Sequence, residues 1–196
     1  RTNWTSSSGV DWTPRVSGTT RDLIAVTVSG GLLIAVGQGG TVLTSPDGAA
    51  WTPRSAVTAL ALRAVTVGSG LTAAVGDGGV IATSSDGAAW HLRSSGSSAN
   101  LNAVVFSGSA FVAVGASGAV LTSPDGGSWS QASSGVTSDL NGVAFGASTY
   151  VAVGDGGAVL TSTTGSSWTP RSSGVTSHLN GVARGASLFV AVGDGG

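Results

Sequence analysis

Apolar and polar residues alternate along this chain in short segments that recur four at a time. In residues 140–178 the segments are LNGVAF (140–145), TYVAVG (149–154), AVLTS (158–162) and SWTPR (167–171), and Gly, Ser and Asp separate them. Short runs rich in Val, Thr, Leu and aromatic residues between turn-forming residues predict β-strands. No longer window has an apolar period of 3.6 residues, so we expect no real helix.

The four-strand pattern repeats every 39 residues without insertion or deletion, as from Leu23 to Leu62. The same interval separates the leucines, glycines and tryptophans at equivalent places in the other repeats. Residues 140–157 and 179–196 differ at only three of 18 positions. We therefore expect that the units were copied recently or were designed.

Four-stranded units repeated around an axis form β-propellers. Pro14, Pro53 and Pro170 fall in the fourth strand of their units. Proline cannot donate a ladder hydrogen bond, so this strand is expected at the outer edge, and the first strand near the axis.

The two ends of the chain each supply half of a unit. Residues 1–22 contain only the third and fourth strands, and residues 179–196 contain only the first and second. We therefore predict an all-β, five-bladed β-propeller of four-stranded antiparallel blades, forming a single domain over residues 1–196. Its full repeats are 23–61, 62–100, 101–139 and 140–178, and a closing blade is shared by residues 1–22 and 179–196.

The turn between the third and fourth strands carries a repeated motif. It reads SPDGAAW at 45–51, SSDGAAW at 84–90 and SPDGGSW at 123–129, while Ser8 and Thr164 replace Asp in the other two copies. An Asp side chain at such a turn accepts hydrogen bonds from the backbone N–H groups that follow it. We interpret the carboxylates as structural and expect a tryptophan to pack beneath each turn. The residues concerned are Asp47, Asp86, Asp125, Trp12, Trp51, Trp90, Trp129 and Trp168.

On these motifs the chain resembles the Asp-box repeats of the BNR, or sialidase, type. It is more closely similar to repetitive bacterial propeller proteins whose VAVG…GG…LTSPDG…W blades are akin to those of photosystem II assembly factors. The resemblance covers the full chain. It implies that the Asp-box is structural, lies away from any active site, and keeps its tryptophan in the core.

The composition argues against catalysis. Every acidic residue is Asp and every basic residue is Arg, and the chain has no Lys, Glu, Cys or Met. This excludes a disulfide scaffold, a cysteine zinc site and a thiol enzyme. The sialidase resemblance implies a Tyr nucleophile activated by Glu, but Glu is absent and Tyr150 replaces the Leu33 and Phe111 of other blades. We expect no catalytic residues, no metal and no cofactor.

Ligand binding is harder to exclude from the sequence. A net charge of −1 argues against nucleic acid, and no apolar run approaches the length of a membrane helix. Polar residues gather at the loops beside the first strand, where an Asn amide offers a donor and an acceptor. The candidate ligand-binding residues are Asn102, Asn141, Asn180, Asp155, Asp194 and His178. The alternative is that the Asn side chains tie the first strand to neighbouring blades or line a narrow wet channel, and that the Asp residues form turns.

Two functions remain open on the sequence alone. The first is a non-catalytic propeller that acts as a structural scaffold or interaction platform. The second is a multivalent lectin with repeated sites between blades. We expect a protein or glycan ligand on the loop face, a monomer, and a secreted or extracellular bacterial location.

Overall fold

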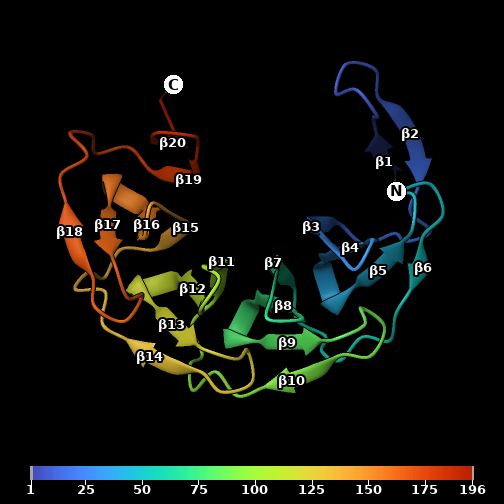
Figure 1. The fold of residues 1–196 in the computed structure, drawn as a ribbon, viewed down its shortest axis with the longest axis horizontal. Helices are drawn as coiled ribbons and strands as arrows, with labels where there is room; N and C mark the ends of the chain where they lie inside the picture. Colours follow the sequence, from blue (N-terminus) through green and yellow to red (C-terminus); the bar gives the residue numbers. More distant parts are fainter. Residues whose placement is uncertain (1, 196) are drawn as a thin grey trace.

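The computed structural model describes residues 2–195 of the chain. It contains four complete four-stranded antiparallel sheets and two two-stranded sheets, which follow one another along an open arc (Figure 1). The helical segments in this part of the chain are four three-residue 3₁₀ turns. The predicted all-β class and the four-stranded antiparallel units are therefore confirmed.

Each complete sheet, or blade, is a meander whose strands lie in sequence order. The first blade contains β3 (Leu23–Ser29), β4 (Leu32–Gly37), β5 (Val42–Ser45) and β6 (Thr52–Pro53). The second contains β7 (Leu62–Gly68), β8 (Leu71–Gly76), β9 (Ile81–Ser84) and β10 (His91–Arg93). The third contains β11 (Leu101–Phe106), β12 (Phe111–Gly115), β13 (Val120–Ser123) and β14 (Ser130–Ala132). The fourth contains β15 (Leu140–Gly146), β16 (Thr149–Gly154), β17 (Val159–Ser162) and β18 (Thr169–Arg171).

The 3₁₀ turns join the second and third strands of each complete blade. They are η1 (Gln38–Gly40), η2 (Asp77–Gly79), η3 (Ala116–Gly118) and η4 (Asp155–Gly157). The glycine before each turn ends its strand in extended backbone. It packs against the backbone at the start of the first strand of the same blade. A β-carbon on Gly76 would lie 1.9 Å from the Ala61 carbonyl oxygen, which explains why glycine recurs at this place in every unit.

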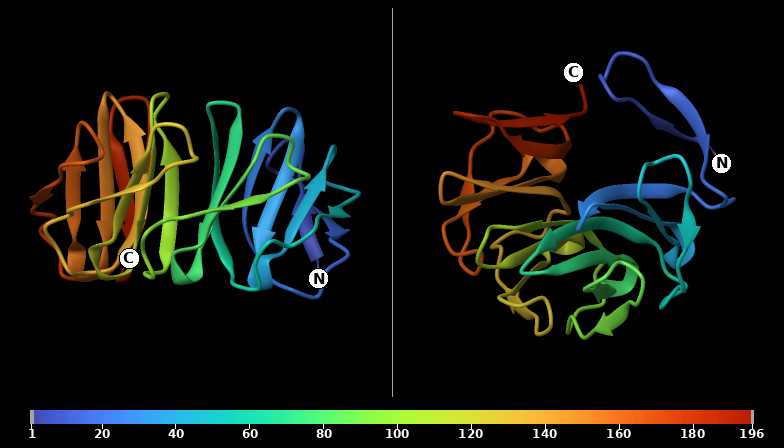
Figure 2. Two further views of the ribbon diagram at one scale, coloured as in Figure 1. Left: turned by 90° about the horizontal axis from the view of Figure 1, so that it is seen from below. Right: turned by 45° about the vertical axis from the view of Figure 1, so that its right-hand side comes forward.

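The strand order within the blades agrees with the proline pattern. The first strand of every blade lies on the inner side of the arc and the fourth lies on its periphery (Figure 1, Figure 2). Pro53 in β6 and Pro170 in β18 thus occupy edge strands, where no ladder partner needs their missing N–H.

The predicted closing blade is absent from the structure. The N-terminal half contains β1 (Thr2–Thr5) and β2 (Thr13–Val16), and the C-terminal half contains β19 (Leu179–Arg184) and β20 (Phe189–Gly193). These are two separate sheets at opposite ends of the arc (Figure 1). Side-chain packing between blades fixes the rotation from each blade to the next, and the successive rotations leave the two ends apart.

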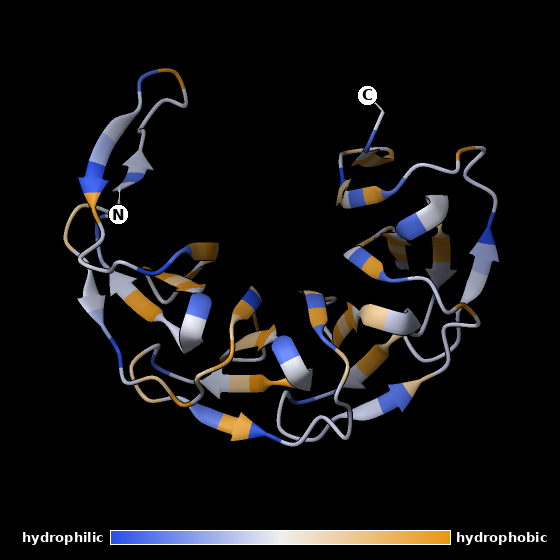
Figure 3. Ribbon diagram, turned by 180° about the vertical axis from the view of Figure 1, so that it is seen from behind, coloured by the Kyte–Doolittle hydropathy of each residue, from blue (hydrophilic) through white to orange (hydrophobic). Residues whose placement is uncertain are grey.

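The hydrophobic core is divided among the blade interfaces. One cluster joins Val112 and Val114 of the third blade to Leu140, Tyr150 and Trp168 of the fourth. Similar clusters join the first blade to the second and the second to the third. Apolar residues occur in runs along the strands of the blades, as in LIAV at the start of β3 (orange in Figure 3). Each blade therefore depends on its neighbours for a buried face.

Candidate functional site

A β-bulge at the start of each inner strand builds the candidate site. The strand register skips one residue at Ile24, Arg63, Asn102, Asn141 and Asn180. A bulge leaves the extra residue outside the ladder and redirects its side chain. Four of these five side chains line one cavity of about 420 Å3, which also includes Asn100, Ala116 and Asp139. We call the bulged residues, the residues just before the inner strands and the first residues of the adjoining turns the rim.

Two of the predicted asparagines connect neighbouring blades. Asn102 Nδ2 donates to the Leu140 carbonyl oxygen at 3.0 Å, and Asn141 Nδ2 donates to the Leu179 carbonyl oxygen at 3.1 Å. Each amide thus reaches the first residue of the next inner strand. The structure gives these side chains a role in holding blade to blade.

Three of the predicted site residues meet around one carboxylate. Asp155 Oδ1 accepts from Asn141 Nδ2 at 2.8 Å and lies 2.9 Å from His178 Nδ1. The hydrogen bond from Asn141, followed by the interaction with His178, lowers the pKa of Asp155 below its ordinary value. This carboxylate is therefore an ionised acceptor at neutral pH and is poorly suited to act as a general acid.

Related pairs occur in other blades. Asn180 Nδ2 donates to Asp194 Oδ1 at 2.7 Å, which repeats the pairing of Asn141 with Asp155. In the second blade Arg63 forms an ion pair with Asp77 at the same two places. In the third blade Ala116 occupies the position of these aspartates, so Asn102 has no carboxylate partner there. The predicted residues therefore form one group of three, one pair and one inter-blade asparagine.

Two residues just before inner strands, Asn100 and Asp139, make contacts that sequence reasoning missed. Asn100 Oδ1 accepts from the Gly78 N–H at 2.9 Å, and Asp139 Oδ1 accepts from the Ser117 N–H at 2.8 Å. Each side chain therefore holds the 3₁₀ turn of the preceding blade. The sequence places these residues on the loop face, but only the packing of successive blades identifies their partner.

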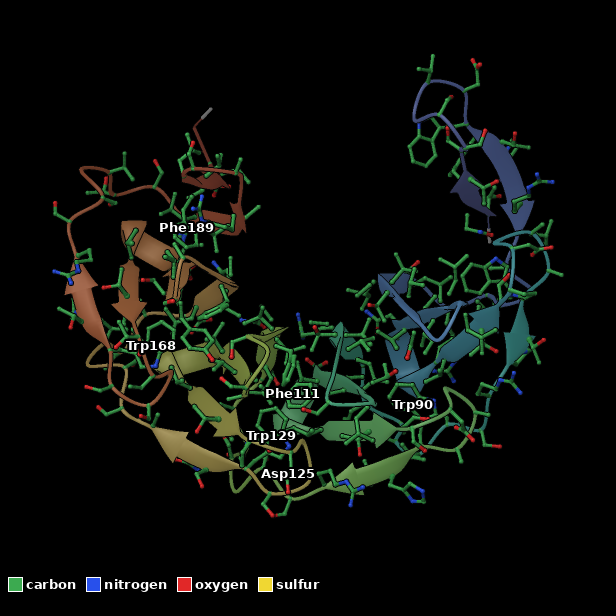
Figure 4. All side chains as sticks on the ribbon, in the orientation of Figure 1. Trp90, Phe111, Asp125, Trp129, Trp168 and Phe189 are labelled. Carbon is green, nitrogen blue, oxygen red and sulfur yellow. The ribbon has the colours of Figure 1, made fainter. Side chains whose placement is uncertain are left out.

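The turns between third and fourth strands lie on the periphery. In the third blade, Asp125 is at the outer margin and Trp129 lies inward of it (Figure 4). The backbone N–H groups of Gly127 and Ser128 donate to Asp125 Oδ1 at 2.8 and 3.0 Å. The hydrogen bond from Ser128, followed by that from Gly127, lowers the pKa of Asp125 below its ordinary value.

A serine common to all five turns was missed from the sequence. Its Oγ accepts from the glycine N–H three residues later at 2.8 Å in every copy. The serines are Ser6, Ser45, Ser84, Ser123 and Ser162. The bond persists where Ser8 or Thr164 replaces Asp, so these turns keep their shape without the carboxylate. Its signal in the sequence was the invariance of the serine among the repeats.

The turn tryptophans differ with their place along the arc. Trp90 and Trp168 are only 5% and 8% exposed, whereas Trp12 is 57% exposed and Trp4 is 58% exposed. Trp12 still donates its ring N–H to the Gly9 carbonyl oxygen at 3.2 Å. The expectation that Trp12 is buried beneath its turn does not hold in the structure. The missing half-blade would have covered both rings.

Within residues 2–195 no group of three or more His, Cys, Asp or Glu side chains is placed to hold a metal ion. No helix in the same residues is long and apolar enough to span a membrane. Tyr150 is buried, with its ring centroid 4.5 Å from that of Phe145 and 6.2 Å from that of Trp168. Tyr150 is thus a core aromatic residue.

Four-stranded antiparallel blades arranged around an inner opening place the chain in the β-propeller fold class. No protein-family model matches it, and neither does any curated protein sequence. Among solved structures it is similar to YCF48 bound to D1 peptide, with a TM-score of 0.71 and 18% identity over 91% of this chain and 62% of that chain. It is also similar to YCF48 from Cyanidioschyzon merolae, with a TM-score of 0.64 and 20% identity over 91% of this chain and 66% of that chain.

A third similar structure comes from the nidogen/laminin complex. Its TM-score is 0.70, with 12% identity over 93% of this chain and 76% of that chain. At these identities the likeness establishes the fold alone. The chain spans less than two thirds of the length of the two YCF48 chains.

Proposed function

We propose that the chain is a non-catalytic propeller module whose rim binds an extended segment of a partner protein. The observation that carries this proposal is the contrast between an invariant framework and a variable rim. The structure of YCF48 bound to D1 peptide supports it, because a propeller of similar fold there binds a peptide.

The rim positions differ from repeat to repeat, whereas several residues of the framework do not. The bulged positions are Ile24, Arg63, Asn102, Asn141 and Asn180, and the positions before them are Asp22, Ala61, Asn100, Asp139 and His178. By contrast, the strand-ending glycine and the turn serine, glycine and tryptophan are the same in every copy. Because the rim residues differ from one repeat to the next, the order of donors, acceptors and charges around the rim has a direction. Such a set suits one chain with a defined direction better than several identical small ligands.

The charge of the rim indicates the kind of segment. The rim carries five carboxylates, one guanidinium and one imidazole, and the guanidinium of Arg21 lies beside the η1 turn. The rim groups are Asp22, Asp77, Asp139, Asp155, Asp194, Arg63 and His178. A partner segment carrying Lys or Arg would complement this excess of negative charge. Salt should weaken its association, because exposed charges are screened.

The lectin alternative uses the same surface but fits it less well. Asn141 Nδ2 already makes two hydrogen bonds within the fold, and Asn102 and Asn180 each make one, so the three amides offer a sugar fewer donors than their number suggests. For the peripheral turns we propose the structural Asp-box role that the motif suggests. The serine, aspartate and tryptophan contacts support that assignment.

The proposal is tested by selecting peptides from a random display library against the immobilised chain. Selected peptides should be rich in Lys or Arg, and calorimetry should show that Asp155→Asn combined with Asp139→Asn weakens their binding by about tenfold or more. The matched control is Gln131→Ala on the outer strand β14, which should leave binding unchanged.

Two results would contradict the proposal. One is selected peptides that bind the rim variant as tightly as the original chain. The other is an absence of peptide binding together with measurable heat from a simple sugar at millimolar concentration, which would favour the lectin.

A further inference from the structure

The rim cavity of about 420 Å3 contains one carboxylate among its lining side chains, that of Asp139. The cavity lies where the inner strands β7, β11 and β15 begin, side by side along the inner side of the arc (Figure 1). We propose that it binds the guanidinium group of one arginine side chain, which the partner segment supplies. This inference deepens the proposed rim function and rests on it for the source of the arginine.

Two other blades show which groups meet near the 3₁₀ turn. In the second blade the guanidinium of Arg63 forms an ion pair with Asp77, the first residue of η2. In the fourth blade His178 Nδ1 lies 2.9 Å from Asp155 Oδ1, at the first residue of η4. In each case a basic side chain of the chain itself lies against the carboxylate.

The third blade has the carboxylate but not the basic side chain. Asp139, the residue just before β15, brings its carboxylate to the η3 turn, where Oδ1 accepts from the Ser117 N–H at 2.8 Å. Among residues 2–195 no Arg or His side chain forms an ion pair with Asp139. The place of the basic partner can therefore be taken by a cation from outside the chain.

Ala116 leaves room for that cation. The other repeats have larger, polar residues at this position, namely Gln38, Asp77, Asp155 and Asp194. Ala116 and Asp139 both line the cavity and are both half-buried. Partial burial strengthens an ion pair, because water then screens the two charges less.

Two amide oxygens add further acceptors to the cavity. Asn102 Nδ2 and Asn141 Nδ2 each donate to a backbone carbonyl oxygen, which can only accept. These bonds fix the nitrogen of each amide toward the next inner strand, so the oxygen lies on the other branch of the amide. Neither oxygen receives a hydrogen bond from the part of the chain that the structure describes. Both asparagines line the cavity.

A guanidinium group suits these acceptors better than an ammonium group does. It presents five N–H donors in one plane and no acceptor, so it can meet a carboxylate and separate amide oxygens at the same time. An ammonium group has three donors and is more strongly hydrated. Arg63 also lines the cavity, but its ion pair with Asp77 offsets its charge. An anionic ligand would instead be repelled by Asp139.

An NMR titration of the isotopically labelled chain with N-acetyl-argininamide tests the site without any peptide. The amide signal of Ser117, which donates to Asp139, should shift and saturate. The signals of Gly127 and Ser128 in the peripheral turn should not move. N-acetyl-lysinamide carries the same charge and should bind about fivefold more weakly or less. The neutral citrulline analogue should give no saturation.

Two substitutions test the cavity residues. Asp139→Asn keeps an oxygen that can accept from the Ser117 N–H and removes the charge, so it should raise the dissociation constant of the arginine analogue by about tenfold or more. Ala116→Gln puts the residue of the first blade into the free space and should also weaken binding. The matched control is Asp11→Asn, which removes the same charge from an exposed residue of the N-terminal half-blade and should leave binding unchanged. Unchanged dispersion of the amide signals shows that each variant is folded.

Three results would overturn this inference. They are a Ser117 signal that does not saturate, equal binding of the lysine or citrulline analogue, and equally tight binding of the arginine analogue by folded Asp139→Asn.

Peptide selection separates this inference from the rim function. Selected basic peptides whose binding ignores both Asp139→Asn and Ala116→Gln would remove the arginine site and leave the rim function. Saturable binding of the arginine analogue without any selected peptide would remove the partner segment and leave the guanidinium site.

Discussion

At the scale of single residues, the near-identity of the blades makes each departure an internal comparison. Thr72 is one such departure, because Leu33, Phe111 and Tyr150 occupy the same place in the other complete blades. Thr72 is buried, and its hydroxyl has no hydrogen-bond partner among residues 2–195. An unpaired hydroxyl in an apolar setting costs stability.

We therefore predict that Thr72→Val stabilises the chain by about 1 kcal/mol, since it keeps the shape and removes the unpaired oxygen. Denaturant unfolding measures the change. The matched control is Thr83→Val, because the Thr83 hydroxyl accepts from Arg93 Nε at 2.8 Å and its loss should destabilise. Destabilisation by Thr72→Val would show that its hydroxyl has a partner.

The turn carboxylates give a pH prediction. Bonds from backbone N–H groups lower the pKa values of Asp47, Asp86 and Asp125 below their ordinary value. A lowered folded-state pKa contributes stability that is present above the unfolded value of about 3.9 and is lost as pH falls through the folded value.

Asp125→Asn should accordingly lower the free energy of unfolding at neutral pH and reduce its fall during acidification. The two proteins should converge below the folded pKa. Thr164→Asp is the reciprocal variant, since it adds the carboxylate to a turn that lacks it, and it should stabilise at neutral pH only. Denaturant unfolding repeated from neutral to strongly acidic pH is the measurement, and a pH-independent difference for Asp125→Asn would contradict the assignment.

At the scale of elements, the blade interface is the unit of stability. Trp168 donates its ring N–H to the Gly165 carbonyl oxygen at 2.7 Å and packs in a cluster shared by the third and fourth blades. Phe111, Trp129 and Trp168 lie within the body of the arc (Figure 4). Trp12 in the N-terminal half-blade makes the same kind of turn hydrogen bond, to the Gly9 carbonyl oxygen, but its ring is 57% exposed.

We predict that Trp168→Ala destabilises the chain by about 3–5 kcal/mol, because it opens a cavity at a blade interface. Trp12→Ala should cost less than about 1 kcal/mol, because its ring is exposed in a single copy. Unfolding by denaturant at low protein concentration compares the two. Similar losses would mean that the N-terminal half-blade is covered in solution.

At the scale of the whole molecule, the complete blades and the two half-blades at the ends of the arc differ in how far their side chains are buried. Inner blades are covered on both faces, so their strands repeat with little change. The two-stranded sheets at the ends expose apolar side chains such as Val190 and Val192, whose equivalents Ile34 and Val36 in the first blade are fully buried.

The sequence by itself determined the repeat, the strands, the edge position of the prolines and the hydrogen bonds that the turn aspartates accept from the backbone, because each depends on local backbone chemistry. It also placed the candidate polar residues on one face. Only the tertiary structure decided that Asn141 and His178 share Asp155, that Asn100 holds Gly78, and that the half-blades stay apart. Those outcomes depend on the rotation between blades, which packing across interfaces sets and which no single 39-residue unit encodes.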